Sequence, residues 1–277
     1  MVFEITDAQV DEYHHAGFVV LRDAVPVEVV APVLDAVGRN ALVVLDREGR
    51  RQHVNTWTWC GDDLLGRLPR CESLVTLAAR VVGGPVHHWH SKISWKSPGS
   101  DGTWDWHQDY AFWIEEGVAR PAMTTIGIAL DDHDTTNGCL RLVADSHDRG
   151  VIEHPAVGHG RAADPVVVDE LVRNNDVIDV ELAAGDAVVF SATMLHASGP
   201  NTSDHQRTFL HCSYNAMDNP ASEPFIDGHQ VHDLVTVPDA AVQPGGYDRV
   251  WGDTAFIHPD ATGYGGRSGY QVIAADG

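Results

Sequence analysis

The chain has 277 residues, and its 18 Lys and Arg residues stand against 40 Asp and Glu residues, which gives a formal net charge of −22. So negative a chain would repel nucleic acid phosphates and anionic membrane surfaces, which favours a small-molecule partner. No apolar run approaches the roughly 18 to 20 residues that span a bilayer. Four cysteines without C-x-x-C spacing, and an N-terminus without the features of a signal peptide, predict a cytoplasmic location.

Residues 1–85 are expected to supply helices and first strands that buttress a sheet. Thr6 and Gln9 form a capping box at a helix start, and Gly17 can end that helix in the left-handed conformation. Pro32 predicts that the next helix starts late or is kinked. The spacing of apolar residues predicts helices over residues 6–15, 30–37 and 71–82 and a strand over residues 18–21.

From residue 86 onwards the hydrophobic period changes to two, which indicates a β sandwich or barrel. Turn signals at residues 98–102 and 183–186 predict two hairpins, each joining the strands on either side. The expected strands cover residues 86–96, 103–109, 124–130, 139–143, 177–182, 187–190 and 207–214.

A single domain of about 200 to 250 residues is common for barrels, so one core with appended helices is the economical interpretation. Residues 86–215 would form this core. Residues 149–175 show no sustained periodicity and predict a long excursion between strands. Residues 216–277 predict a tail that packs on the barrel or on a second subunit of a homodimer.

The segment from Trp104 to Asp109 carries the first candidate metal ligands. In a strand, residues two positions apart share a face, so His107 and Asp109 would point the same way. They supply two thirds of the 2-His-1-carboxylate set that binds non-haem Fe(II). His196, beside a turn, offers the third ligand, and Arg207 follows as a cation that could hold a dicarboxylate.

Each of these residues also has an ordinary structural alternative. The chain has 17 histidines, most of which must be surface or hydrogen-bonded residues, and His205 and His211 compete with His196. Asp109 could be a turn carboxylate, and Arg207 could pair with Asp204 on the surface.

His107-x-Asp109, His196 and Arg207 together resemble the phytanoyl-CoA dioxygenase family of Fe(II)/2-oxoglutarate oxygenases, with the nearest local match in the ectoine hydroxylases. The similarity runs from residue 5 to about residue 215. It is carried by Thr6 to Gln9, Gly17 to Leu21, Lys92-Ile93-Ser94, Trp104 to Asp109, Trp113 and Pro121-Ala122-Met123.

The resemblance implies a mainly β fold with flanking helices, a double-stranded β-helix or jelly-roll barrel. It implies Fe(II) on His107, Asp109 and His196, 2-oxoglutarate chelating the iron, and O2 as the second cosubstrate. Arg207 would bind the distal carboxylate, with Ser198 as a second donor. Ser94 and Lys92 are further candidate cosubstrate residues, although Ser94 stands where the ectoine hydroxylases have Asn.

The activity implied is hydroxylation of an unactivated C–H bond of a small molecule, with release of succinate and CO2. The substrate would be an amino-acid derivative or a natural-product intermediate, and the departure at Ser94 puts ectoine itself in doubt. Desaturation, cyclisation or epimerisation at the same iron remain open, as does a metal-binding jelly-roll protein without turnover. His147 is expected to be structural, and the candidate substrate contacts are Trp113, Phe112, Trp57 and Trp59, which as large aromatics could equally be core residues.

Overall fold

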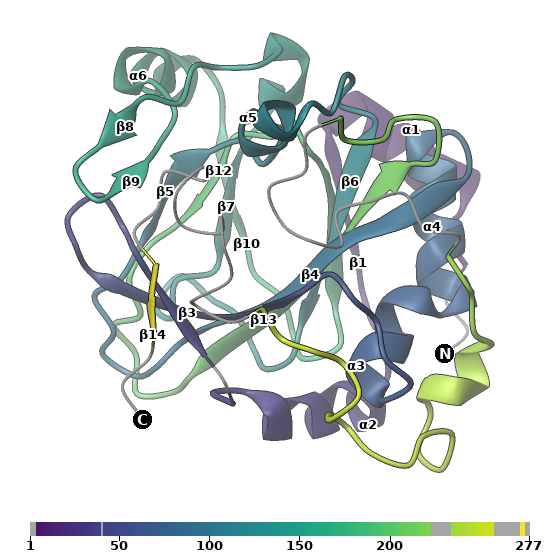
Figure 1. Ribbon diagram of the computed structural model, residues 1–277. Helices are drawn as coiled ribbons and strands as arrows, with labels where there is room; N and C mark the ends of the chain where they lie inside the picture. The colour runs from purple at the N-terminus through teal and green to yellow at the C-terminus, as the bar shows by residue number, and fades with distance from the viewer. Residues whose placement is uncertain (1–3, 40, 223–233, 258–271, 275–277) are drawn as a thin grey trace.

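The computed structural model describes residues 4–39, 41–222, 234–257 and 272–274, and its centre is a pair of antiparallel sheets (Figure 1). The larger sheet has the order β1-β11-β6-β13-β4-β3-β2-β14 and the smaller has the order β10-β7-β12-β5. The larger sheet contains β1 (Phe18–Leu21), β2 (Leu42–Leu45), β3 (Arg51–Trp57), β4 (Val86–Lys96), β6 (Met123–Ala129), β11 (Ala187–Ser191), β13 (Arg207–Ala216) and β14 (Val272–Ala274). The smaller contains β5 (Trp104–His107), β7 (Leu140–Val143), β10 (Val177–Val180) and β12 (His196–Ser198).

The two sheets face each other across a buried apolar cluster, as in a jelly roll. Leu142 and Val180 of the smaller sheet pack in this cluster with Phe190 and Phe209 of the larger sheet. The backbone of Gly127 in β6 approaches Phe209 so closely that a Cβ atom there would lie 2.3 Å from the ring. The expected mainly β, jelly-roll fold is therefore confirmed, with its core between the sheets.

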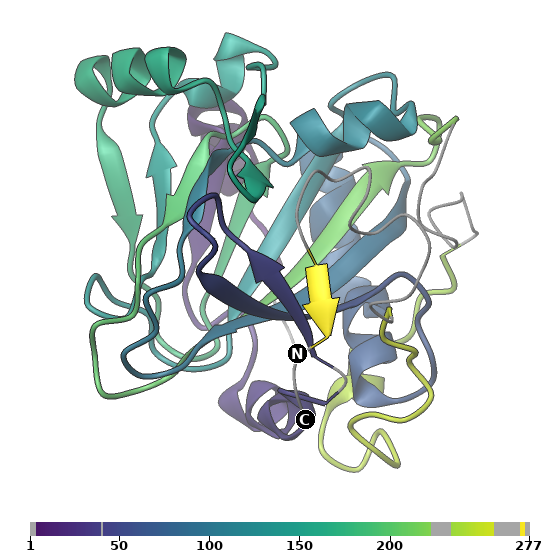
Figure 2. The same cartoon turned by 60° about the vertical axis from the view of Figure 1, so that its left-hand side comes forward.

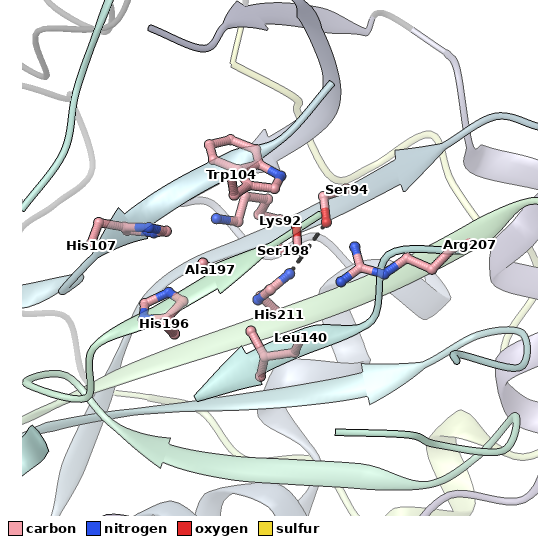
Figure 3. A pocket seen from close by; sticks show the side chains of 10 residues that line it. All are labelled: Lys92, Ser94, Trp104, His107, Leu140, His196, Ala197, Ser198, Arg207 and His211. Atoms are coloured by element: carbon pink, nitrogen blue, oxygen red, sulfur yellow. Dashed lines mark hydrogen bonds between the residues drawn. The ribbon is translucent and has the colours of Figure 1, made fainter. Parts of the chain in front are cut away.

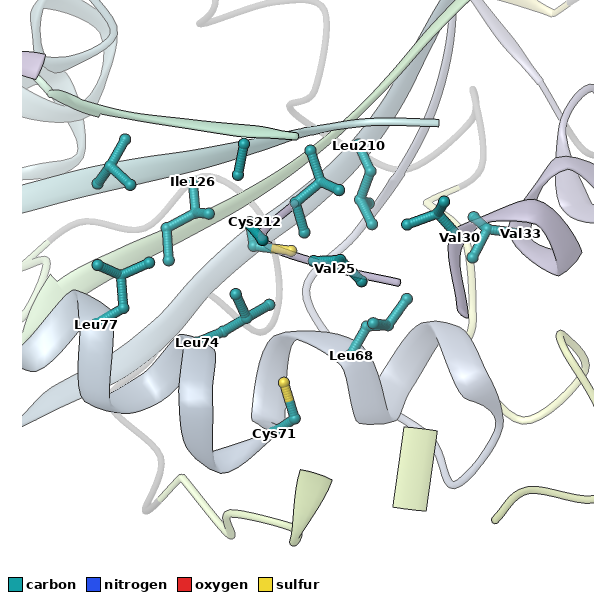
Figure 4. Packing of buried hydrophobic residues seen from close by; sticks show 14 of the residues in the cluster. Val25, Val30, Val33, Leu68, Cys71, Leu74, Leu77, Ile126, Leu210 and Cys212 are labelled. Atoms are coloured by element: carbon teal, nitrogen blue, oxygen red, sulfur yellow. The ribbon is translucent and has the colours of Figure 1, made fainter. Parts of the chain in front are cut away.

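Helices cover the outer face of the larger sheet. Leu74 and Leu77 of α4 pack onto Ile126, Leu210 and Cys212, as Figure 4 shows. The helices are α1 (Asp7–Ala16), α2 (Val27–Val30), α3 (Leu64–Arg67), α4 (Glu72–Val82), α5 (Tyr110–Trp113) and α6 (Pro165–Asn174). The 3-10 turns are η1 (Ala31–Ala36), η2 (Leu68–Arg70), η3 (Ile114–Glu116), η4 (Ser146–Arg149) and η5 (Asp239–Val242). Within the described ranges no helix has the length and apolar character needed to cross a membrane.

The local signals near the N-terminus are confirmed. Thr6 and Gln9 form the reciprocal capping box of α1, and Gly17 ends that helix with a φ of 79°. The helix expected at residues 30–37 is only partly right, because α2 begins earlier and the chain tightens into η1 at Pro32. A proline lacks the N–H that a continuing α-helix needs, so this change of pitch has a simple cause.

Both predicted hairpins are wrong. β4 and β5 belong to different sheets, and so do β10 and β11, so each turn carries the chain from one sheet to the other. β5 pairs with β12, and β10 pairs with β7. Two strands with alternating apolar residues and a turn between them give the same sequence pattern whether they form a hairpin or cross between facing sheets. Only the pairing with strands elsewhere in the chain distinguishes the two cases.

The region expected to be an irregular excursion contains regular structure. Residues 149–175 include the small hairpin of β8 (Ala156–Val157) and β9 (Gly160–Arg161), followed by α6. Asp164 caps α6 by accepting a hydrogen bond from the backbone N–H of Val166. Figure 2 shows α6 lying across the end of the smaller sheet.

Part of the C-terminal tail packs on the molecule itself. Val242 is fully buried in the cluster beneath the larger sheet, and Val237 forms a bridge with Cys71 just before α4. The backbone N–H of Leu64 donates to the carbonyl of Arg249. The segments 223–233, 258–271 and 275–277 of the predicted tail lie outside the described residues. The division into one domain and the homodimer stay predictions.

Candidate metal centre

Three side chains from β5, β12 and the turn into α5 lie close together. His107 of β5 and His196 of β12 are direct partners in the strand pairing, and their ring centroids lie 4.1 Å apart. The Oδ1 atom of Asp109 lies 3.7 Å from Nε2 of each imidazole. Among the described residues, this is the one set of three His, Cys, Asp or Glu side chains whose potential ligand atoms all lie within 4.8 Å.

Hydrogen bonds orient both imidazoles. Nδ1 of His107 donates to the carbonyl of Asp105 at 2.7 Å, and Nδ1 of His196 donates to the carbonyl of Met194 at 2.9 Å. Burial lowers the pKa of both histidines, that of His107 well below its ordinary value. The rings are therefore neutral near pH 7 with a lone pair on Nε2 facing Asp109, as metal ligation requires. This donor set fits Fe(II).

Asp109 reaches the site by a route that differs from the expected one. β5 ends at His107, and Asp109 has helical backbone angles (φ −59°, ψ −41°) at the N-cap of α5. Strand parity therefore does not explain why the two side chains converge, and the strand predicted over residues 103–109 is too long. The chain bends at Gln108, and the turn into α5 directs the carboxylate back to the imidazoles. Thr125 lies 3.4 Å away as a donor to Asp109 Oδ2.

A narrow pocket extends from the two histidines to Arg207. Figure 3 shows His107 and His196 at one end and Arg207 at the other. The pocket is lined by Lys92, Ser94, Trp104, His107, Leu140, His196, Ala197, Ser198, Arg207 and His211.

Arg207 is buried and lacks a partner for part of its guanidinium. Nε has no hydrogen-bond partner within the described part of the chain, and the guanidinium carbon lies 5.0 Å over the Phe209 ring. Burial lowers the pKa of Arg207 to about 10, so the group stays charged at neutral pH. The surface alternative is wrong, because the Asp204 carboxylate contacts His205 instead. Burying a cation without a paired carboxylate lowers the stability of the fold, so this site favours binding of an anionic ligand.

Polar groups between the two ends complete this environment. The Ser198 hydroxyl oxygen is buried without a hydrogen-bond partner in the described structure. Lys92 lies with its ammonium 5.1 Å from the centre of the Trp104 ring, and burial lowers its pKa. Ser94 is within hydrogen-bonding distance of His211 Nε2 at 3.3 Å. Two cations and an unpartnered hydroxyl near a metal-ligand set fit a dicarboxylate that also chelates a metal.

The four aromatic residues considered for substrate contact divide into two pairs. Phe112 borders the centre, with its ring 6.0 Å from that of His107, whereas Trp113 packs against Trp89. Trp57 is fully buried in the core outside the larger sheet, and Trp59 is 64% exposed on the rim of a separate pocket. None of these four residues lines the metal pocket, so their part in substrate contact stays a prediction.

The structure adds residues that the sequence alone did not single out for the site. His211, considered only as a competitor of His196, lines the pocket, and Gln108 and His154 lie buried behind the ligands. The sequence spacing of these residues does not reveal their place near the site, because their contacts join segments that are far apart in the chain. His147 packs its ring against Gly17, where a Cβ atom would lie 2.4 Å from the imidazole.

The chain is similar to known enzymes over most of its length. Residues 13–209 match the model of the family described as phytanoyl-CoA dioxygenase. An L-proline trans-4-hydroxylase of Streptomyces griseoviridis is 35% identical over 59% of this chain and 67% of that protein. An ectoine dioxygenase of Bordetella bronchiseptica is 26% identical over 78% of this chain and 77% of its own.

A solved structure shares the fold. The crystal structure of EctD from S. alaskensis with 2-oxoglutarate and 5-hydroxyectoine superposes with a TM-score of 0.69, at 18% identity, over 84% of this chain and 88% of that one. At this identity the superposition shows the fold alone, whereas the family match spans the metal-ligand set and Arg207 in sequence order. The chain belongs to the phytanoyl-CoA dioxygenase family.

Proposed function

We propose that the chain is an Fe(II)- and 2-oxoglutarate-dependent dioxygenase that hydroxylates an unactivated C–H bond of a small molecule, releasing succinate and CO2. The observation that carries this proposal is one pocket with the ligand set of His107, Asp109 and His196 at one end and the incompletely paired Arg207 at the other. A protein that only retained metal would gain nothing from burying that cation.

Each side chain has a role in this proposal. His107, Asp109 and His196 would hold Fe(II), and Arg207 with Ser198 would bind the distal carboxylate of 2-oxoglutarate. Lys92 and Ser94 would contact the same cosubstrate. The bound iron, 2-oxoglutarate and O2 supply the oxidising chemistry, while the protein positions the target carbon and excludes water.

The relatives support a class of substrate. The relatives' names indicate action on proline and on ectoine, which supports small zwitterions, amino-acid derivatives and natural-product intermediates as candidates here. Phe112 and Trp113 remain the candidate substrate contacts. Desaturation, cyclisation or epimerisation would use the same residues, because the position of the substrate carbon relative to the metal decides among them.

The wider setting is also a proposal. The charge of −22 supports a small-molecule partner over nucleic acid or a membrane surface. All four cysteines are free thiols, three of them buried, which supports a reducing, cytoplasmic location.

The test is an anaerobic titration with Fe(II) and 2-oxoglutarate, followed by a substrate screen that measures succinate formation in air. We expect succinate release that depends on iron and on one class of substrate, and that is lost in Asp109→Ala. Crystals of the loaded protein should place the three ligand atoms at about 2.0 to 2.3 Å from one metal. Metal binding without 2-oxoglutarate binding would favour the metal-binding protein without turnover.

A further inference from the structure

Gln108, the residue between two of the metal ligands, is completely buried, and its side chain is hydrogen-bonded at both ends. Its Nε2 donates to the carbonyl of Gly150 at 2.9 Å and to that of Thr193 at 2.7 Å. Its Oε1 accepts from the backbone N–H of Ile152 at 2.7 Å. The turn that carries Asp109 is thus tied to the segment after η4 and to the chain just before His196.

The backbone N–H of Gln108 has an unusual partner, the side chain of His154. It donates to His154 Nε2 at 2.9 Å. A backbone N–H can only donate, so Nε2 of His154 must be the unprotonated nitrogen. The proton therefore lies on Nδ1, which donates to the carbonyl of Ile152 at 2.8 Å. His154 is 6% exposed, so water does not readily replace this bond.

Three histidines around the centre share one arrangement. In His107, His196 and His154, Nδ1 lies at hydrogen-bond distance from the carbonyl two residues earlier in the chain. Two of the rings present the lone pair on Nε2 towards Asp109, and the third presents it to the peptide that joins His107 to Asp109. Burial lowers the pKa of His154 to about 4, so the acceptor form persists near neutral pH.

We propose that His154 is a positioning residue of the metal centre, acting through the Gln108 peptide. This inference rests on the proposed function, because it assigns residues 150–154 a role in supporting the proposed metal ligands. The hydrogen bond fixes the peptide plane between the two ligands, and so fixes the direction in which the Asp109 side chain leaves the turn. Without the acceptor, the buried N–H of Gln108 would have to turn away and Asp109 would lose its alignment with the two imidazoles.

A pair of amide substitutions separates this role from simple packing. In His154→Gln the side-chain oxygen can reach the place of Nε2 and accept from Gln108. In His154→Asn it is one methylene too short. Both variants remove the ring, so they should lose similar packing. His159→Asn, at an exposed histidine in the same segment, is the control.

The measurement is the affinity for Co(II), a redox-stable substitute for Fe(II), in protein without 2-oxoglutarate. We expect His154→Asn to weaken Co(II) binding about tenfold to a hundredfold, the range typical of lost ligand support, and His154→Gln and His159→Asn to stay within about threefold of the unmutated protein. Equal affinities in the Asn and Gln variants, whether unchanged or equally weakened, would overturn the proposal.

A second measurement needs no variant to fold. Nitrogen NMR of the unmutated protein should show His154 protonated on Nδ1 and the Gln108 amide protected from exchange. A proton on Nε2 would overturn the proposal. Failure of the unmutated protein to bind Co(II) would count against the proposed function, and the NMR result would still report on His154.

Discussion

Replacing Arg207 by methionine should separate cosubstrate binding from metal binding and fold stability. Methionine keeps most of the side-chain volume over the Phe209 ring and removes the charge. Arg207 makes none of the contacts that orient the metal ligands, because it lies at the opposite end of the pocket. The variant should therefore keep its metal affinity and lose its affinity for 2-oxoglutarate.

The size of the effect can be worked from the burial of the guanidinium. The pKa of Arg207 falls from 12.5 to about 10, which corresponds to roughly 3 kcal/mol of unfavourable burial of the charged form. The depressed pKa means that the cation opposes folding at pH 7, so Arg207→Met should stabilise the protein without cosubstrate. Without this cation, the distal carboxylate of 2-oxoglutarate should lose about 3 to 4 kcal/mol of binding free energy, which is roughly a 100-fold to 1,000-fold loss of affinity.

The assay is an anaerobic titration of metal-loaded protein with 2-oxoglutarate, paired with chemical denaturation of the metal-free protein. Arg207→Lys should recover part of the affinity, because a single ammonium cannot reproduce bidentate binding. Arg141→Ala, which removes an exposed ion pair with Asp179, is the matched control. Equal loss of metal and cosubstrate affinity in Arg207→Met, or a less stable metal-free protein, would refute this reasoning.

Three other predictions concern the fold and the reaction. Burial alone would raise the pKa of Asp46, but hydrogen bonds from Arg50 and Thr103 outweigh burial and lower that pKa. The ionised carboxylate therefore stabilises the fold above about pH 4. Chemical denaturation from pH 7 to pH 3 should show that Asp46→Asn loses less unfolding free energy than the unmutated protein as the pH falls. Gly127→Ala forces a methyl group against the Phe209 ring. The unfolding free energy should therefore fall by about 1 to 3 kcal/mol, and 2-oxoglutarate should bind more weakly. An unchanged melting temperature would contradict this packing. In the proposed function the Asp109 carboxylate would occupy a position on the metal that a halide would need. Turnover under labelled dioxygen with excess chloride should therefore give a product with one labelled oxygen, and a chlorinated main product by mass spectrometry would rule this out.

Features set by a few neighbouring residues could be predicted from the sequence. The capping box of Thr6 and Gln9, the left-handed Gly17 and the extent of β4 depend on local hydrogen bonds and on a period of two, which the chain displays directly. Strand partners depend on contacts between residues far apart in the chain. The turns after β4 and β10 therefore gave no sign that they cross between sheets.

The candidate site shows the same division. The spacing of His107 and Asp109 predicts that they share the face of one strand, whereas a turn into α5 brings their side chains together. α6 begins with an N-cap at Asp164 and a proline in its first turn, two local helix-start signals within the segment predicted to be irregular. The bond between His154 and Gln108 spans 46 residues, and no local pattern marks it.

The histidine ligands belong to the smaller sheet and Arg207 belongs to the larger one. The distance between a metal held by these histidines and the Arg207 guanidinium would therefore depend on the spacing of the two sheets. That spacing is maintained by the apolar cluster that contains Leu142 and Phe190. If Arg207 binds the distal carboxylate as proposed, the chain length of the dicarboxylate that fits would depend on this core packing, and therefore on residues that never touch the cosubstrate.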